Sequence, residues 1–141
     1  HKVVLFEKTG ELGGNFIRAA KEEFKNDLRD YLDWSIRTIS NDENIDIRIN
    51  TEATPELVMA ENPDAIIIAV GSTPIIPNFT ATGTDKIVWV GDADKNKLGK
   101  KVIIAGGGFT GLEAALEYSN AGKEVTVVDM IPESALGKEL Q

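Results

Sequence analysis

The segment KVIIAGGGFTG, residues 101–111, joins a short apolar strand to a turn with glycines at 106, 108 and 111. Gly106 permits a tight bend, Gly108 lets the backbone approach a pyrophosphate, and Gly111 lets the following helix pack close to the strand. The helix predicted over residues 112–122 presents N–H groups and the positive end of its dipole to the phosphates. Together, strand, turn and helix predict a nucleotide-binding βαβ unit.

The next predicted strand, KEVTVVD, ends on Asp129, 18 positions after Gly111 and close to the roughly 20 that a dinucleotide fingerprint expects. A carboxylate there accepts hydrogen bonds from both ribose hydroxyls of an adenosine and repels a 2′-phosphate. No arginine follows in Met130-Ile131-Pro132 to neutralise one. We therefore predict that Gly106, Gly108, Gly111 and Asp129 bind NAD(H) rather than NADP(H). The alternatives are a turn that only reverses the chain and a methyltransferase-type turn, and the helix-packing glycine argues against the second.

Working outward, the remaining sequence predicts further strands and helices in alternation. A helix over about Lys25–Ile39 carries one apolar face, and Tyr31 and Trp34 beside it are expected in the core. Thr54 is the expected N-cap of a short helix with Pro55 at its first position, which Asn62-Pro63-Asp64 ends. Strands are expected at residues 2–8, 45–50, 65–71 and 86–90. The predicted class is α/β, a Rossmann-like three-layer fold with a mainly parallel sheet, incomplete.

Residues 72–100 are irregular and rich in proline and glycine, which predicts a linker. We expect a truncated FAD-type nucleotide-binding half with linker over 1–99, and the first βαβ unit of an NAD-binding domain over 100–141. Because the chain opens directly on a strand pattern, we expect a fragment of a longer protein. The central strand between residues 3–7 and 65–70 would then be absent. We predict that residues 101–105 fill this gap in one hybrid sheet, with strand exchange between copies, and so a homo-oligomer, as the second option.

The amino-acid composition limits the classes of partner and cofactor that this chain is expected to bind. The 141 residues carry a net charge of -8 with no Lys/Arg cluster, so we expect no nucleic acid partner. There is no cysteine and one histidine, which leaves no material for a disulfide, an iron–sulfur cluster or a His-based metal site in this stretch. No apolar run approaches the roughly 20 residues of a membrane span, and we expect a cytoplasmic protein that does not bind membranes.

Three motifs carry a family resemblance: E-K-x-x-x-L-G-G-N from Glu7, A-I-I-I-A-V-G-S-x-P-x-x-P from Ala65, and G-G-G-F-T-G from Gly106. They resemble the two-dinucleotide-domain flavoproteins, in particular the FAD/NAD-binding C-terminal region of the NADH:flavin oxidoreductase family (enoate reductase and 2,4-dienoyl-CoA reductase type). The resemblance runs from Val3 to about Gly137 and indicates a truncated fragment. It implies missing parent domains, which in this family hold FMN and an iron–sulfur cluster.

The resemblance also implies roles for individual residues. Glu7 would bind the FAD ribose, and the other flavin positions would be Lys8, Gly13, Gly14, Ala69, Val70 and Gly71. The intact protein would pass hydride from NADH to a flavin and then reduce an unsaturated substrate. The FAD pyrophosphate loop is missing, so we expect weak FAD binding, and no catalytic residue is identified here. The alternatives are a non-catalytic nucleotide-binding or assembly domain, or another two-dinucleotide-domain reductase.

Overall fold

The chain forms two compact units, His1–Pro74 and Ile75–Gln141. The structure is a computed structural model, and it describes residues 1–75 and 83–136. The division between the units falls at residue 74 rather than at the predicted residue 99, so the later part of the predicted linker groups with the second unit. Residues 76–82 of that linker lie outside the described residues.

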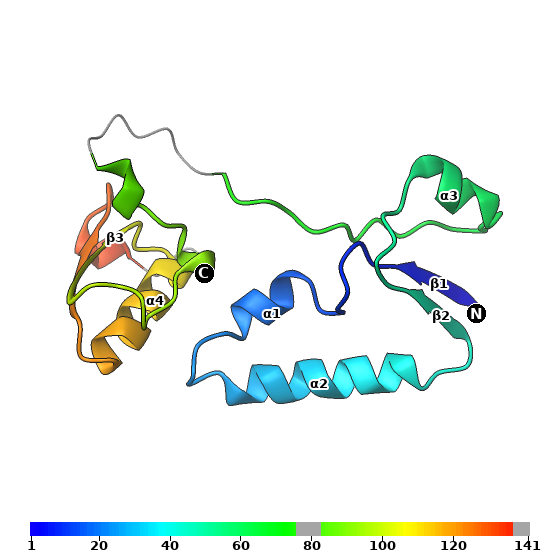
Figure 1. The fold of residues 1–141 in the computed structure, drawn as a ribbon, viewed down its shortest axis with the longest axis horizontal. Coiled ribbons are helices and arrows are strands. Elements are labelled where there is room, and N and C mark those ends of the chain that lie inside the picture. Colours follow the sequence, from blue (N-terminus) through cyan, green and yellow to red (C-terminus); the bar gives the residue numbers. More distant parts are fainter. Residues whose placement is uncertain (76–82, 137–141) are drawn as a thin grey trace. The chain divides into compact units, whose positions relative to one another are not determined.

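The first unit contains a parallel pair of strands, β1 (Val3–Phe6) and β2 (Ile45–Arg48), aligned from Val3 opposite Ile45 to Phe6 opposite Arg48. The chain between them forms α1 (Asn15–Ala19) and α2 (Asn26–Ser40), as Figure 1 shows. A parallel pair needs such a crossover because the chain must return to the same end of the sheet. The predicted strands here and the long helix are confirmed, whereas α1 is an addition.

The aromatic pair on α2 departs from expectation. Tyr31 and Trp34 are 57% and 53% exposed, so the prediction that they lie in the core is wrong. Their ring centroids are 5.7 Å apart, and Phe16 of α1 lies 6.0 Å from Tyr31. The rings therefore pack on one another beside the apolar face of the helix, where much of their surface stays in water.

The short helix α3 (Pro55–Ala60) forms as its end signals predict. The Thr54 hydroxyl oxygen accepts a hydrogen bond from the Leu57 N–H at 3.2 Å, and Pro55 occupies the first turn, where its missing N–H costs nothing. The helix ends before Asn62-Pro63-Asp64.

Residues 65–71, predicted as a buried parallel strand, form no strand. Ile67, Ile68 and Val70 are 91%, 81% and 82% exposed, and β1 pairs with β2 alone within the described residues. The reason is physical: an apolar segment becomes a strand only when a neighbour offers hydrogen-bond partners to its backbone. Residues 101–105 do not pair with them and belong to a second sheet, with β4 as partner. The predicted hybrid sheet is therefore wrong. Strand exchange between copies stays a prediction.

The second unit is a βαβ arrangement. Strand β3 (Lys101–Ala105) leads into α4 (Phe109–Asn120), and β4 (Glu124–Val128) returns parallel to β3, with Lys101 opposite Glu124 and Ala105 opposite Val128. The strands and the helix are confirmed. Short 3-10 turns precede and follow them: η1 (Thr84–Lys86), η2 (Val90–Asp92) and η3 (Glu133–Ala135).

The core of this unit consists of Ala93, Ile104, Ala114 and Tyr118, which connect η2, β3 and α4. Val90 packs against this cluster from η2, so the prediction of a strand over residues 86–90 is wrong. A single turn of helix is enough to bring its apolar side chain to the core.

Both described sheets are parallel and alternate with helices, which confirms the incomplete α/β, Rossmann-like class. None of the helices in the described part of the chain has the length and apolar character to cross a membrane. Over the same residues, no three His, Cys, Asp or Glu side chains gather in a way that would hold a metal ion.

Candidate dinucleotide-binding site

The glycine turn between β3 and α4 has the backbone shape that its sequence predicts. Gly106 has a φ of 111°, in the region that side chains with a Cβ rarely adopt. Its N–H donates to the Val128 carbonyl oxygen at 2.8 Å, which ties the start of the turn to the end of β4. The turn and the tip of the second strand therefore form one corner of the unit.

Gly111 is required for the close packing of helix on turn. A Cβ at this buried position would lie well under 3.0 Å from the Gly106 carbonyl oxygen, and 3.4 Å from the Ile104 side chain. The predicted packing role of Gly111 agrees with this geometry. Gly108 differs, because its φ of -67° and ψ of 177° suit any residue. A ligand role for Gly108 stays a prediction.

The N-terminus of α4 is suited to bind an anion. This 12-residue helix begins after Gly108, and no side chain caps it. The first N–H groups of a helix have no acceptor within the helix, and its dipole places positive potential there. A pyrophosphate at this corner would accept hydrogen bonds that the protein's own side chains leave unmade.

Asp129 follows β4 and its carboxylate is directed at the glycine turn. Its Oδ2 accepts a hydrogen bond from the Gly107 N–H at 2.5 Å, and its Oδ1 accepts one from the Ile131 N–H at 3.0 Å. These backbone N–H groups, first that of Gly107 and then that of Ile131, hold the pKa of the Asp129 carboxyl below its usual value. The carboxylate is thus ionised, exposed and fixed in direction at neutral pH.

The structure adds two residues that the motif did not identify, Gly107 and Leu136. Gly107 is buried, and a Cβ there would lie 2.5 Å from Cδ2 of Leu136, the residue that follows η3. The signal in the sequence was the middle glycine of G-G-G, which stands at a position where the motif allows any residue. No motif in the sequence indicated a role for Leu136.

In the first unit, the predicted flavin residues lie at the end of β1 and in the loops around it. The Glu7 carboxylate accepts from the Thr9 N–H at 2.7 Å and from the Thr9 hydroxyl at 2.8 Å, and these bonds lower the pKa of Glu7. Lys8 forms an exposed ion pair with Glu52 at 2.9 Å, which raises the pKa of Lys8. Both side chains therefore have partners within the protein.

The structure brings Asn15, the residue after the Gly13-Gly14 pair, near Gly71, 56 positions further along the chain. Asn15, which follows the glycine pair, donates from Nδ2 to the Ser72 hydroxyl at 3.3 Å, and a Cβ on Gly71 would lie 3.6 Å from the same nitrogen. All three glycines have positive φ. Ala69 and Val70 belong to the exposed segment before them and take no part in this contact.

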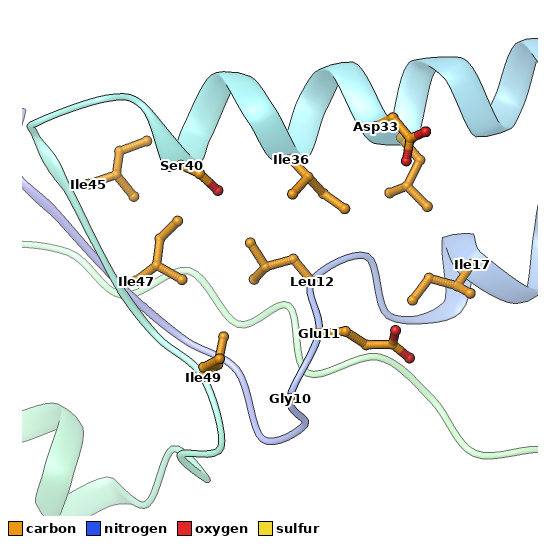
Figure 2. Close-up of a pocket in the computed structure, with 11 residues that line it drawn as sticks. Gly10, Glu11, Leu12, Ile17, Asp33, Ile36, Ser40, Ile45, Ile47 and Ile49 are labelled. Atoms are coloured by element: carbon orange, nitrogen blue, oxygen red, sulfur yellow. The ribbon is translucent and has the colours of Figure 1, made fainter.

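Beside α2 the first unit has a hollow of about 780 Å³, shown in Figure 2. Ile36 of α2 and Leu12 of the preceding loop point into it opposite Ile45 and Ile47 of β2. In the described part of this unit, Ala20 is the one buried apolar residue, so the helix and the sheet are loosely packed. Glu11, Asp33 and Ser40 also line the hollow, which is wide open to solvent. The glycine turn of the second unit is therefore the better-defined site.

Known proteins are similar to this chain over most of its length. The model of the pyridine nucleotide-disulphide oxidoreductase family matches residues 6–141. Cinnamate reductase of Clostridium sporogenes is 39% identical over 132 residues, which cover 92% of this chain and 19% of the relative. NADH oxidase of Thermoanaerobacter brockii is 30% identical over 145 residues, which cover 99% of this chain and 22% of the relative.

Among solved structures, a 2-naphthoyl-CoA reductase in complex with 2-naphthoyl-CoA matches with a TM-score of 0.71 and 31% identity, over 90% of this chain and 19% of that one. The chain thus spans about a fifth of the length of these relatives. The NADH:flavin oxidoreductase resemblance is confirmed at the level of the family. This chain belongs to the pyridine nucleotide-disulphide oxidoreductase family, whose members are oxidoreductases that bind FAD and NAD(H).

Proposed function

We propose that the second unit binds NADH and presents its nicotinamide to a flavin held elsewhere in the intact protein, which then reduces an unsaturated substrate. Bound flavin and nicotinamide supply the hydride chemistry, and the residues of this chain bind and orient the dinucleotide. The observation that carries the proposal is the Asp129 carboxylate, hydrogen-bonded to the turn at the end of β4.

The glycine turn supports the proposal of a pyrophosphate site, and the Asp129 carboxylate supports the proposed preference for NADH over NADPH. Each oxygen of Asp129 accepts one backbone N–H and keeps acceptor capacity for a ribose hydroxyl. The same charge would repel a 2′-phosphate, and the adjacent Met130 is fully exposed without offering a cation. NADH is therefore the proposed donor, in preference to NADPH.

The proposed substrate class rests on similarity alone. Two relatives are named as reductases of cinnamate and of 2-naphthoyl-CoA, compounds that contain conjugated double bonds. A third is named an NADH oxidase, which is consistent with the proposed donor.

We further propose that Glu7, Lys8, Gly13, Gly14, Ala69, Val70 and Gly71 contact FAD in the intact protein. In this chain, Thr9 and Glu52 already bind the first two side chains, and Ala69 and Val70 are exposed. FAD should therefore bind this chain more weakly than NADH does.

Calorimetric titration of the 141-residue chain with NADH, NADPH and FAD tests these proposals. NADH should bind at least about tenfold more tightly than NADPH, which corresponds to one charge-assisted hydrogen bond. Asp129→Asn should reduce that preference. Glu124→Gln, at the opposite end of β4 where Glu124 pairs with Lys100 at 3.3 Å, should leave it unchanged. Equal or tighter binding of NADPH by the parent chain would refute the assignment of Asp129.

A further inference from the structure

Gly107 and Leu136 form a close contact at the mouth of the glycine turn. Gly107 is buried, its N–H donates to Oδ2 of Asp129, and Leu136 lies on the side where a Cβ would project. A methyl group at residue 107 would stand 2.5 Å from Cδ2 of Leu136 and 3.3 Å from Oδ2 of Asp129. The space for any side chain is therefore already filled by these two residues.

We propose that Gly107 is a positioning residue whose N–H and missing side chain set the orientation of Asp129, and so determine the preference for NADH over NADPH. This inference rests on the proposed function and adds two residues to it. Leu136 limits the space, and Gly107 makes the hydrogen bond.

The chemistry of a ribose explains why the orientation matters. Adjacent 2′- and 3′-hydroxyls are both recognised by one carboxylate only when its two oxygens face them together. A carboxylate on a rotating side chain would lose entropy on binding, whereas one held at both oxygens has lost it already. Gly107 holds Oδ2 and Ile131 holds Oδ1, so the plane of the group is set before the nucleotide arrives.

The backbone at Gly107 requires no glycine, because it is not among the residues with positive φ. Crowding is therefore the reason for glycine here. The shortest contact is with the Leu136 side chain, and the contact of 3.3 Å with Oδ2 of Asp129 is tight by only a few tenths of an ångström, so removing the leucine side chain should make an alanine tolerable at residue 107. The inference thus predicts a rescue by a second substitution.

The test uses Gly107→Ala, Leu136→Ala and the double variant of the 141-residue chain, titrated with NADH and NADPH. Gly107→Ala should weaken NADH binding about tenfold, the loss expected for one hydrogen bond to a charged group, and change NADPH binding much less. Leu136→Ala is the reference for the double variant, because it removes the leucine side chain and keeps glycine at residue 107. The double variant should recover the parent's ratio of NADH to NADPH affinity.

These titrations distinguish a failure of the proposed function from a failure of the positioning role of Gly107. A parent chain that binds no NADH, or prefers NADPH, overturns the proposed function. A parent chain that prefers NADH, with a Gly107→Ala variant that keeps the same preference or a double variant without recovery, overturns the positioning role alone.

A measurement without nucleotide covers the case in which Gly107→Ala does not fold. The amide proton of Gly107 should resonate downfield by NMR and move upfield in Asp129→Asn, while Glu124→Gln leaves it in place. An amide signal insensitive to Asp129→Asn would overturn the positioning role.

Discussion

Replacing Gly111 with alanine tests the packing of helix on turn. The added Cβ would lie well under 3.0 Å from the carbonyl oxygen of Gly106 and 3.1 Å from its carbonyl carbon. Both atoms belong to the backbone, so no side-chain rotation relieves the clash. Either α4 moves away from β3 or the turn changes shape, and both displace the N–H groups that would bind a pyrophosphate.

The magnitude follows from two opposing effects. Overpacking costs about 1–3 kcal/mol, and a rigid backbone neighbour places this case at the upper end. Alanine regains about 1 kcal/mol in helix propensity over glycine at a helical position. We expect a net loss of about 2 kcal/mol in the free energy of unfolding of the second unit. The same displacement should weaken NADH binding at least about tenfold.

Urea unfolding followed by tryptophan fluorescence measures this loss. The chain has two tryptophans, one in each unit, so a Trp34→Phe background leaves Trp89 as the reporter of the second unit. With a slope of about 1–2 kcal/mol per molar urea, the midpoint should fall by about 1–2 M. Gly99→Ala is the matched control, because a Cβ there meets no atom within 4 Å.

One result would refute this reasoning. If Gly111→Ala unfolds at the same urea concentration as Gly99→Ala and binds NADH equally well, the close approach of helix and turn is not what glycine provides at this position.

Three further predictions follow from individual side chains. The pKa of Asp129 is lower in the folded protein than its ordinary value, so the hydrogen bonds of the carboxylate stabilise the site above the ordinary pKa and are lost as pH falls through the lower folded pKa. Calorimetry should therefore find an NADH affinity that is constant between about pH 5 and 8 and falls only below about pH 4. A loss of affinity centred near pH 6 would contradict the prediction. Combining Asp129→Asn with Met130→Arg removes the repelling charge and places a cation beside the proposed ribose site, so calorimetry should show that NADPH binds more tightly than NADH. An unchanged preference for NADH would show that the ribose does not lie beside these two residues. Thr54→Ala removes the cap of α3 and should cost about 1 kcal/mol in urea unfolding, whereas Thr54→Ser should cost little, and equal losses would show that the hydroxyl is not the source.

The local geometry of the candidate site could be predicted from the sequence at positions where a single residue carries the constraint. Gly106 needs positive φ, Gly111 needs the absence of a Cβ, and Asp129 needs only to end a strand of the right length. Each of these requirements is local and restricts the residue type at a single position of the sequence. Leu136 could not be predicted, because its role depends on where the chain turns after β4, and one leucine among many carries no mark.

The same distinction explains why residues 65–71 misled the prediction. Their apolar run is typical of a strand that is covered on both faces, yet the side chains of Ile67 and Ile68 are almost fully exposed. A strand, however, is a property of two segments, since every backbone hydrogen bond in it needs a partner on the neighbour. Residues 101–105 have that partner in β4, where Gly106 continues the pairing by donating to Val128, and they form a strand. No described segment offers one to residues 65–71, so hydrophobic composition alone leaves them extended and unpaired. Sequence composition therefore predicts what a segment would form beside the right neighbour, and the structure depends on whether that neighbour is present.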